Sequence, residues 1–202
     1  MSNEKGLNIL ICGSQKFSDE SFVFGMMDQI YKAYNGRIDS VLTSKFSGSC
    51  EFVRKWVANT NEAIQEFSTL NKNGFQSAPS LINSLDCTFD MHLEKENNSL
   101  YEDINIPEFI IQNDPFFQKG KELLIARNVN MILAFPNKEG VLGPSTQNIR
   151  RFAKLAQLDK TFFDCSDAYK AINNFRNEAI SKIDQTESVN HGFNNRHPGK
   201  KI

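Results

Sequence analysis

The sequence has few features that point to a metal site, a disulfide framework or a membrane segment. Its four cysteines form no Cys-x-x-Cys pair and are not grouped with its three histidines. Zinc sites and disulfide frameworks usually show such spacing, so we expect no metal and a reduced, cytoplasmic setting. No apolar run approaches the roughly 20 residues that a helix needs to span a bilayer. The first residues, Met-Ser-Asn-Glu-Lys-Gly, lack a secretory signal, so we expect no membrane association.

An excess of charge of one sign is also absent. The chain of 202 residues has 23 basic and 24 acidic residues and a net charge of −1 at pH 7. Proteins that bind nucleic acid through bulk attraction to phosphates carry a basic excess, so we do not expect nucleic acid as a partner. With 40% hydrophobic and 23% charged residues, the composition is that of a soluble globular protein.

Short apolar runs alternate with amphipathic segments in the first third of the chain. Residues 7–12 and 40–43 predict strands, and residues 20–34 and 50–59 place apolar side chains at helical spacing. Residues 63–67 predict a third strand. This β-α-β-α-β order indicates a parallel sheet with right-handed crossover connections.

The rest of the chain is expected to complete the same sheet after an irregular segment. Residues 68–118 contain turn signals such as Asn73-Gly74 and Asp114-Pro115, so we interpret them as an insertion after the third strand. We therefore predict an α/β, Rossmann-like three-layer fold with a mainly parallel sheet, in one domain over residues 1–183. Residues 184–202 are expected to form a disordered tail. The later elements are expected at 118–128 (helix), 130–135 (strand), 146–157 (helix), 160–164 (strand) and 166–183 (helix).

Three loops at the predicted carboxyl ends of strands carry glycines and hydroxyl groups. Open parallel sheets bind ligands at this edge, near the point where the strand order reverses. A glycine lets the backbone approach a ligand closely, and a helix start offers free N–H groups and a positive dipole end to a phosphate. Each loop alone also fits a plain turn, whereas the three together favour a phosphate-bearing ligand. The residues expected to bind it are Gly13, Ser14, Gln15, Ser47, Gly48, Ser49, Gly143, Ser145, Thr146 and Arg150. Ser145 and Thr146 are also expected to cap the helix that follows.

Residues 11–19, Ile-Cys-Gly-Ser-Gln-Lys-Phe-Ser-Asp, resemble the Gly-Ser-Arg-x-Phe-x-Asp opening of the SLOG superfamily, a group of Rossmann-like proteins related to LOG phosphoribohydrolases. Residues 43–51 lie where a small bacterial and phage branch has Gly-Gly-Ala-x-Gly-Ala-Asp, and residues 135–153 resemble that branch's Phe-Pro-x-Gly-x-Gly-Thr ending. The resemblance covers residues 7–67 and 119–165. It implies a nucleotide-derived ligand, a homodimer, and a place for Arg127 on the ligand side.

The sequence also departs from this family pattern at three places. Gln15 stands where the family prefers arginine, which removes a fixed cation, and Ser44-Lys45 replaces a pair of glycines. LOG hydrolases carry a carboxylate shortly after the threonine of the last motif, whereas residues 147–149 here are Gln-Asn-Ile. Cleavage of an N-glycosidic bond needs such a charge or a base for water. Glu51 is the one general base that we nominate.

These observations lead to a main hypothesis and two alternatives. The main hypothesis is a protein that binds a nucleotide or nucleotide-derived small molecule, as a sensor or a sequestering protein, without a cofactor. One alternative is a nucleotide-processing hydrolase, LOG-like or related, that uses Glu51, Asp19 or a carboxylate from the insertion. The other is a protein-interaction module that kept the fold and lost the ligand. Cys12 and Cys50 lie near the same loops, and we expect them to be packing residues because no histidine is predicted beside them.

Overall fold

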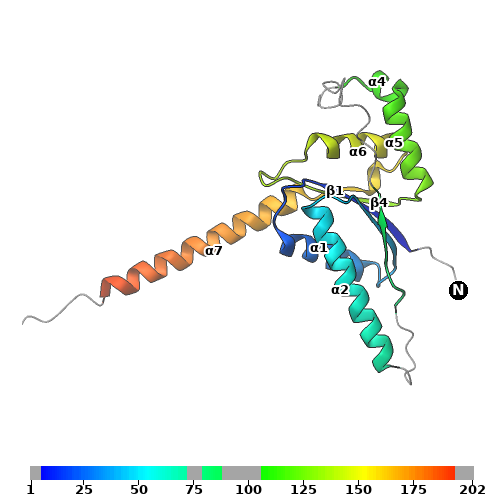
Figure 1. Ribbon diagram of the computed structural model, residues 1–202. Helices are drawn as coiled ribbons and strands as arrows, with labels where there is room; N and C mark the ends of the chain where they lie inside the picture. The colour runs from blue at the N-terminus through cyan, green and yellow to red at the C-terminus, as the bar shows by residue number, and fades with distance from the viewer. Residues whose placement is uncertain (1–5, 72–78, 88–105, 194–202) are drawn as a thin grey trace, which may run out of the picture. The chain divides into compact units, whose positions relative to one another are not determined.

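Five parallel strands form one sheet in the order β3-β2-β1-β4-β5, which confirms the predicted α/β, Rossmann-like class (Figure 1). The computed structural model describes residues 6–71, 79–87 and 106–193. The central strands β1 and β4 are apolar and mostly buried, as strands covered on both faces must be. The strands are β1 (Leu7–Gly13), β2 (Ile38–Thr43), β3 (Asn83–Asp86), β4 (Met131–Phe135) and β5 (Phe162–Asp164).

Helices cover both faces of the sheet and complete the three layers (Figure 1). Helices α1 (Glu20–Ala33) and α2 (Ser49–Leu70) pack together on one face. On the other face, α5 (Pro115–Ala126) packs against α6 (Pro144–Leu155) and against the short α4 (Glu108–Asn113). A single 3-10 turn, η1 (Asp159–Thr161), leads into β5. This pairing of helices follows from right-handed crossovers on each side of the strand reversal.

The third strand lies elsewhere than the sequence predicted. Residues 63–67 belong to α2, which runs on to Leu70 because its buried residues Val53, Val57 and Ile64 continue one helical stripe. The third strand is β3, inside the segment that we interpreted as an insertion. All four of its residues, Asn-Ser-Leu-Asp, are exposed, so this edge strand carries no apolar run that a sequence pattern can detect. Part of the interpreted insertion, residues 72–78 and 88–105, lies outside the described residues.

The last helix is longer than predicted. The chain divides into two compact units, Met1–Ser166 and Asp167–Ile202, and the helix α7 (Ser166–Phe193) provides the described part of the second. The expected boundary at residue 183 lies inside this helix. Residues 184–193 are therefore helical where we expected a disordered tail, and residues 194–202 lie outside the described part. Among the helices of the described ranges, none has the length and hydropathy that a membrane span requires.

Candidate functional site

The predicted ligand loops meet at one edge of the sheet. Since all strands are parallel, β1, β2 and β4 end on the same side, and the loops after them hold most of the residues singled out by the sequence. The strand order reverses between β1 and β4, where open parallel sheets bind ligands. The structure thus places residues 13–15, 47–49 and 143–146 at this carboxyl edge.

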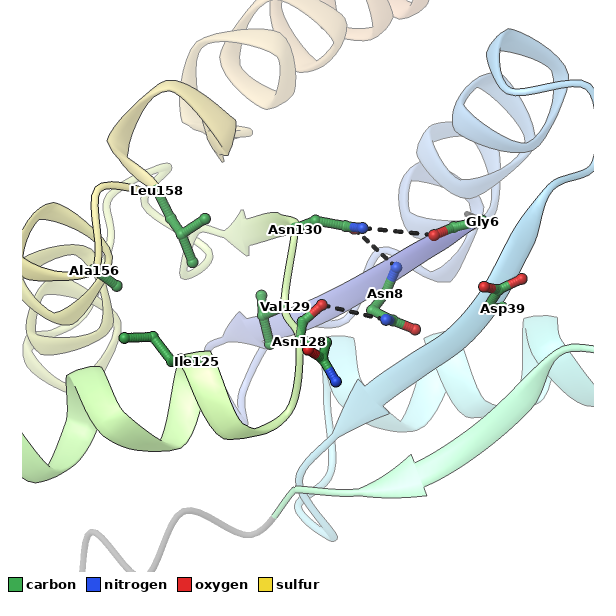
Figure 2. Close-up of a pocket in the computed structure, with 9 residues that line it drawn as sticks. All are labelled: Gly6, Asn8, Asp39, Ile125, Asn128, Val129, Asn130, Ala156 and Leu158. Atoms are coloured by element: carbon green, nitrogen blue, oxygen red, sulfur yellow. Dashed lines mark hydrogen bonds between the residues drawn. The ribbon is translucent and has the colours of Figure 1, made fainter. Parts of the chain in front are cut away.

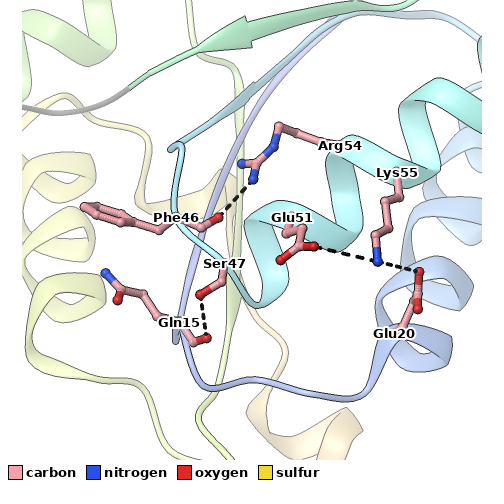
Figure 3. A network of polar contacts seen from close by, with 7 residues as sticks. All are labelled: Gln15, Glu20, Phe46, Ser47, Glu51, Arg54 and Lys55. Carbon is pink, nitrogen blue, oxygen red and sulfur yellow. Dashed lines mark hydrogen bonds and ion pairs between the residues drawn. The ribbon is translucent and has the colours of Figure 1, made fainter.

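The loops after β1 and β2 are in direct contact (Figure 3). The Ser47 hydroxyl donates to the backbone carbonyl of Gln15 at 3.2 Å. Gly48 has φ 73° and lies against the carbonyl of Ser14, so a side chain there meets both backbone strain and a collision. The Ser14 hydroxyl accepts a hydrogen bond from the N–H of Lys16 at 3.1 Å. The two loops therefore form one joined surface.

Arg54, which the sequence analysis did not single out, holds the second loop in place (Figure 3). It lies on the second turn of α2, and its guanidinium donates to the carbonyl of Phe46 at 3.0 Å. The same guanidinium also donates to the carbonyl of Ser44. This contact fixes the loop that contains Ser44 and Lys45. Nothing in the sequence spacing indicates it, because the acceptors are backbone atoms eight and ten residues away.

Helices α1, α2 and α6 begin at this edge and differ in how they are capped. The Asp19 carboxylate caps α1 by accepting from the N–H of Phe22 at 2.9 Å. Helices α2 and α6 instead have glycines as N-caps, Gly48 and Gly143, with no side-chain cap. The expectation that Ser145 and Thr146 cap α6 is wrong, because the helix starts at Pro144 and includes them in its first turn. The first N–H groups of α2 and α6 thus lack a capping side chain and suit an anion.

Ser49, the first residue of α2, contributes a buried hydroxyl with no hydrogen-bond partner. Its side chain is fully buried, and Ser49 Oγ is one of two such unpartnered oxygens in the described part of the chain. A Cβ on Gly13 would lie 2.5 Å from it, so the end of β1 packs directly on the start of α2. An unpaired buried hydroxyl costs about 1–3 kcal/mol, so native structures rarely keep one without a reason.

The charged candidates near this edge have partners on the protein. Glu51 is half-exposed and lies 3.7 Å from Lys55, which also approaches Glu20 at 3.8 Å (Figure 3). Arg150 lies 3.9 Å from Asp164, and its guanidinium is 5.5 Å from the centre of the Phe162 ring. Arg150 therefore interacts with β5, two turns away from the start of α6.

Arg127 lies at the opposite edge of the sheet. It is the C-cap of α5, and β4 begins four residues later, so it stands near the amino ends of the strands. The backbone of Arg127 therefore lies away from the loops of the carboxyl edge, while its charge acts on the thiol of Cys87, the residue that follows β3. Its neighbour Asn128 lines a pocket at the amino edge.

The four cysteines are buried free thiols. Burial raises the pKa of Cys12 well above its ordinary value, and it raises the pKa of Cys87 to about 11 and of Cys165 to about 12. The Cys12 thiol donates to the Leu133 carbonyl at 3.5 Å. A protonated, buried thiol is a poor nucleophile, so Cys12, Cys87 and Cys165 act as packing residues. Over the described ranges, no group of three His, Cys, Asp or Glu side chains could hold a metal ion.

We expect the native protein to resist thiol labelling at pH 8. Fewer than one cysteine per chain should react with Ellman's reagent before unfolding, and all four should react in denaturant. Because folding raises the pKa values of Cys12, Cys87 and Cys165, their protonated thiols contribute a pH-dependent part of the free energy of unfolding. That contribution is complete below pH 9, and it is lost as the pH rises through the higher thiol pKa values of the folded state. Rapid labelling of a native thiol would contradict the packing role.

The fold and this edge define a Rossmann-like α/β protein with a candidate anion site at the carboxyl ends of its strands. Comparisons with family models, with curated proteins and with solved structures found no match. The resemblance to the SLOG superfamily therefore remains a hypothesis that rests on residues 11–19, 43–51 and 135–153.

Proposed function

We propose that this protein binds a nucleotide or nucleotide-derived small molecule through its phosphates at the carboxyl edge of the sheet. One observation carries the proposal: two helices without side-chain caps, α2 and α6, begin at this edge and both pack against β1. The unpartnered hydroxyl of Ser49 lies at one of these starts. Phosphate oxygens accept hydrogen bonds from such N–H groups and are favoured by the positive dipole ends.

The charges around the edge are consistent with an anionic ligand. Lys16, in the loop after β1, is exposed and forms no ion pair within the described residues. Lys45, in the loop after β2, pairs with Asp86 at 3.1 Å, so its charge is already balanced. We therefore expect Lys16, rather than the glutamine at position 15, to supply the cation that the family's arginine provides.

Binding is favoured over turnover at this site. The first turn of α6 carries no carboxylate, and Glu51 is engaged by Lys55. Stabilising an oxocarbenium ion or activating water needs a placed carboxylate, so a sensor or sequestering role fits these residues better. A cytoplasmic location fits the four buried free thiols, and a homodimer remains an expectation from the family resemblance.

Thermal unfolding with a panel of nucleotides tests the proposal. The panel holds nucleoside mono-, di- and triphosphates, NAD, ADP-ribose and cyclic dinucleotides. A ligand at about 100 times its Kd adds about 2.7 kcal/mol, which raises Tm by several degrees. Analysis of the bound mixture for free base or ribose phosphate separates a sensor from a hydrolase. The absence of any shift would contradict nucleotide binding and favour the interaction module.

The variant Ser49→Ala should raise the stability of the free protein and weaken the ligand-induced shift. Removing an unpaired buried hydroxyl relieves a cost of about 1 kcal/mol, while a phosphate would lose a donor. Both quantities come from the same thermal unfolding series, without and with the strongest ligand.

Ser40→Ala is the matched control. Ser40 is also buried, but its hydroxyl donates to the side-chain oxygen of Asn8. Its loss leaves that oxygen unpaired and should destabilise the protein by about 1–2 kcal/mol. If Ser49→Ala destabilises the free protein as much as Ser40→Ala, the Ser49 hydroxyl has a partner. An unchanged ligand shift would place the phosphate elsewhere.

A further inference from the structure

A pocket of about 610 Å³ lies at the amino edge of the sheet, away from the candidate phosphate site (Figure 2). One part of its wall is apolar and comes from the ends of α5 and α6 and the segments that follow them: Ile125, Val129, Ala156 and Leu158. The other part comes from the first residues of β1 and β2 and from the segment before β4. Its size is within the range of small-molecule sites, about 300–1,000 Å³.

Two helices end at this pocket with their negative dipole ends. At the end of α5, the N–H of Val129 donates to the carbonyl of Leu124 at 3.1 Å. The residue before Val129, Asn128, has a left-handed φ of 50°. Helix α6 closes in the same way, with the N–H of Leu158 bonded to the carbonyl of Ala153 at 2.8 Å. This is the closure in which a left-handed residue ends a helix. Since Val129 and Leu158 line the pocket, both helix ends border it, and helix C-termini favour cations.

Asp39 is the one charged residue among the nine that line this pocket. It is exposed, it lies on the second position of β2, and it forms no ion pair within the described part of the chain. The polar groups beside it are occupied by one another: Asn8 N–H donates to Asn130 Oδ1 at 2.8 Å, and Asn8 Nδ2 donates to the Asn128 carbonyl at 3.2 Å (Figure 2). These asparagines form a polar wall that their mutual hydrogen bonds hold in place. The Asp39 carboxylate is then the charged group that a ligand in the pocket contacts.

We propose that this pocket binds an organic cation, a primary ammonium or guanidinium group carried on an apolar body. The cation lies near Asp39 and the carbonyl ends of α5 and α6, and the apolar body packs on Ile125, Val129 and Leu158. An anion of the same shape is expected not to bind, because the Asp39 carboxylate and the negative ends of α5 and α6 repel it. Two arginines stand close to lining residues in the sequence, Arg37 shortly before Asp39 and Arg127 directly before Asn128, and neither is among the lining residues. The charge of Arg127 instead acts on Cys87, whose pKa it lowers against the larger effect of burial.

Titration of the ¹⁵N-labelled protein with n-hexylammonium chloride, at about 10 mM ionic strength, tests this proposal. Saturable shifts are expected at the amides of Gly6, Val129 and Leu158, with hexanol weaker and sodium hexanoate inactive. The amides of Ser49 and Thr146 report on the other edge, so the outcome is independent of the phosphate site. Equal binding of all three compounds, or shifts only at the carboxyl edge, would overturn the proposal.

Three variants locate the cation. Asp39→Asn should weaken hexylammonium binding at least about threefold, as expected for one partly exposed charge pair. Glu62→Gln, which removes an exposed carboxylate on α2, should leave the affinity unchanged. Ile125→Lys should abolish binding, because residue 125 is 54% exposed in the last turn of α5 and a lysine there brings its own ammonium to the pocket. Unchanged affinity in both Asp39→Asn and Ile125→Lys would exclude this pocket as a cation site.

Discussion

Replacing Gly48 by alanine is expected to destabilise the protein by about 3 kcal/mol, whereas the same change at Gly143 costs less than about 1 kcal/mol. Both residues are N-caps, of α2 and α6. Gly48 has φ 73° and ψ −138°, a conformation almost restricted to glycine, and a Cβ there collides with the carbonyl of Ser14. Gly143 has φ −72°, which any residue adopts, and a Cβ there meets nothing within 4 Å.

Urea denaturation of both variants measures this difference, and the nucleotide panel extends it to function. Gly48→Ala separates the loops after β1 and β2, so it should lose the ligand-induced rise in Tm as well as stability. Gly143→Ala leaves the start of α6 open and should keep that rise. Equal stability of the two variants would mean that the loops do not pack as described. A ligand shift that survives in Gly48→Ala would place the phosphate on α6 alone.

The sequence predicted the fold best where burial repeats with a regular period. The apolar runs of β1 and β4 and the helical stripe of α1 were detectable because their surroundings impose one pattern along several residues. Strand β3 was missed because an exposed edge strand needs no apolar residues. The buried stripe of α2 continues through residues 63–67. Taken alone, these residues have the pattern of a strand, so the sequence analysis assigned them wrongly.

The candidate site was only partly predictable for a similar reason. Glycines and serines that end a strand and begin a helix are neighbours in sequence, so the three loops could be placed at one edge from the order of elements alone. Arg54 acts through backbone carbonyls, for which no side-chain pattern exists. Arg127 was assigned through the family resemblance, and its place after α5 puts it at the other edge. The amino-edge pocket combines segments far apart in the chain, which no local motif records.

The variant Gly120→Ala should destabilise the protein by about 1–3 kcal/mol, although alanine is the better helix former by about 1 kcal/mol. Gly120 lies within α5, and a Cβ there would lie 2.5 Å from ring carbons of Phe152 on α6. That ring is almost fully buried and packs against Phe116 and Phe117, with ring centres 5.3 and 6.0 Å away. Because both neighbours hold the ring, α6 itself must shift to make room for a methyl group.

Gly25→Ala provides the control, because Gly25 is an exposed residue within α1 whose Cβ would meet nothing within 4 Å. Only the backbone preference changes there, so stability should rise by about 0.5–1 kcal/mol. The two variants therefore shift the urea midpoint in opposite directions if contact with Phe152 decides the first. Since α6 also carries Thr146 at the candidate site, Gly120→Ala should reduce the nucleotide-induced rise in Tm, while Gly25→Ala leaves it unchanged. A rise in stability for both variants would show that α5 and α6 do not pack closely at Phe152, and that the start of α6 is positioned by other contacts.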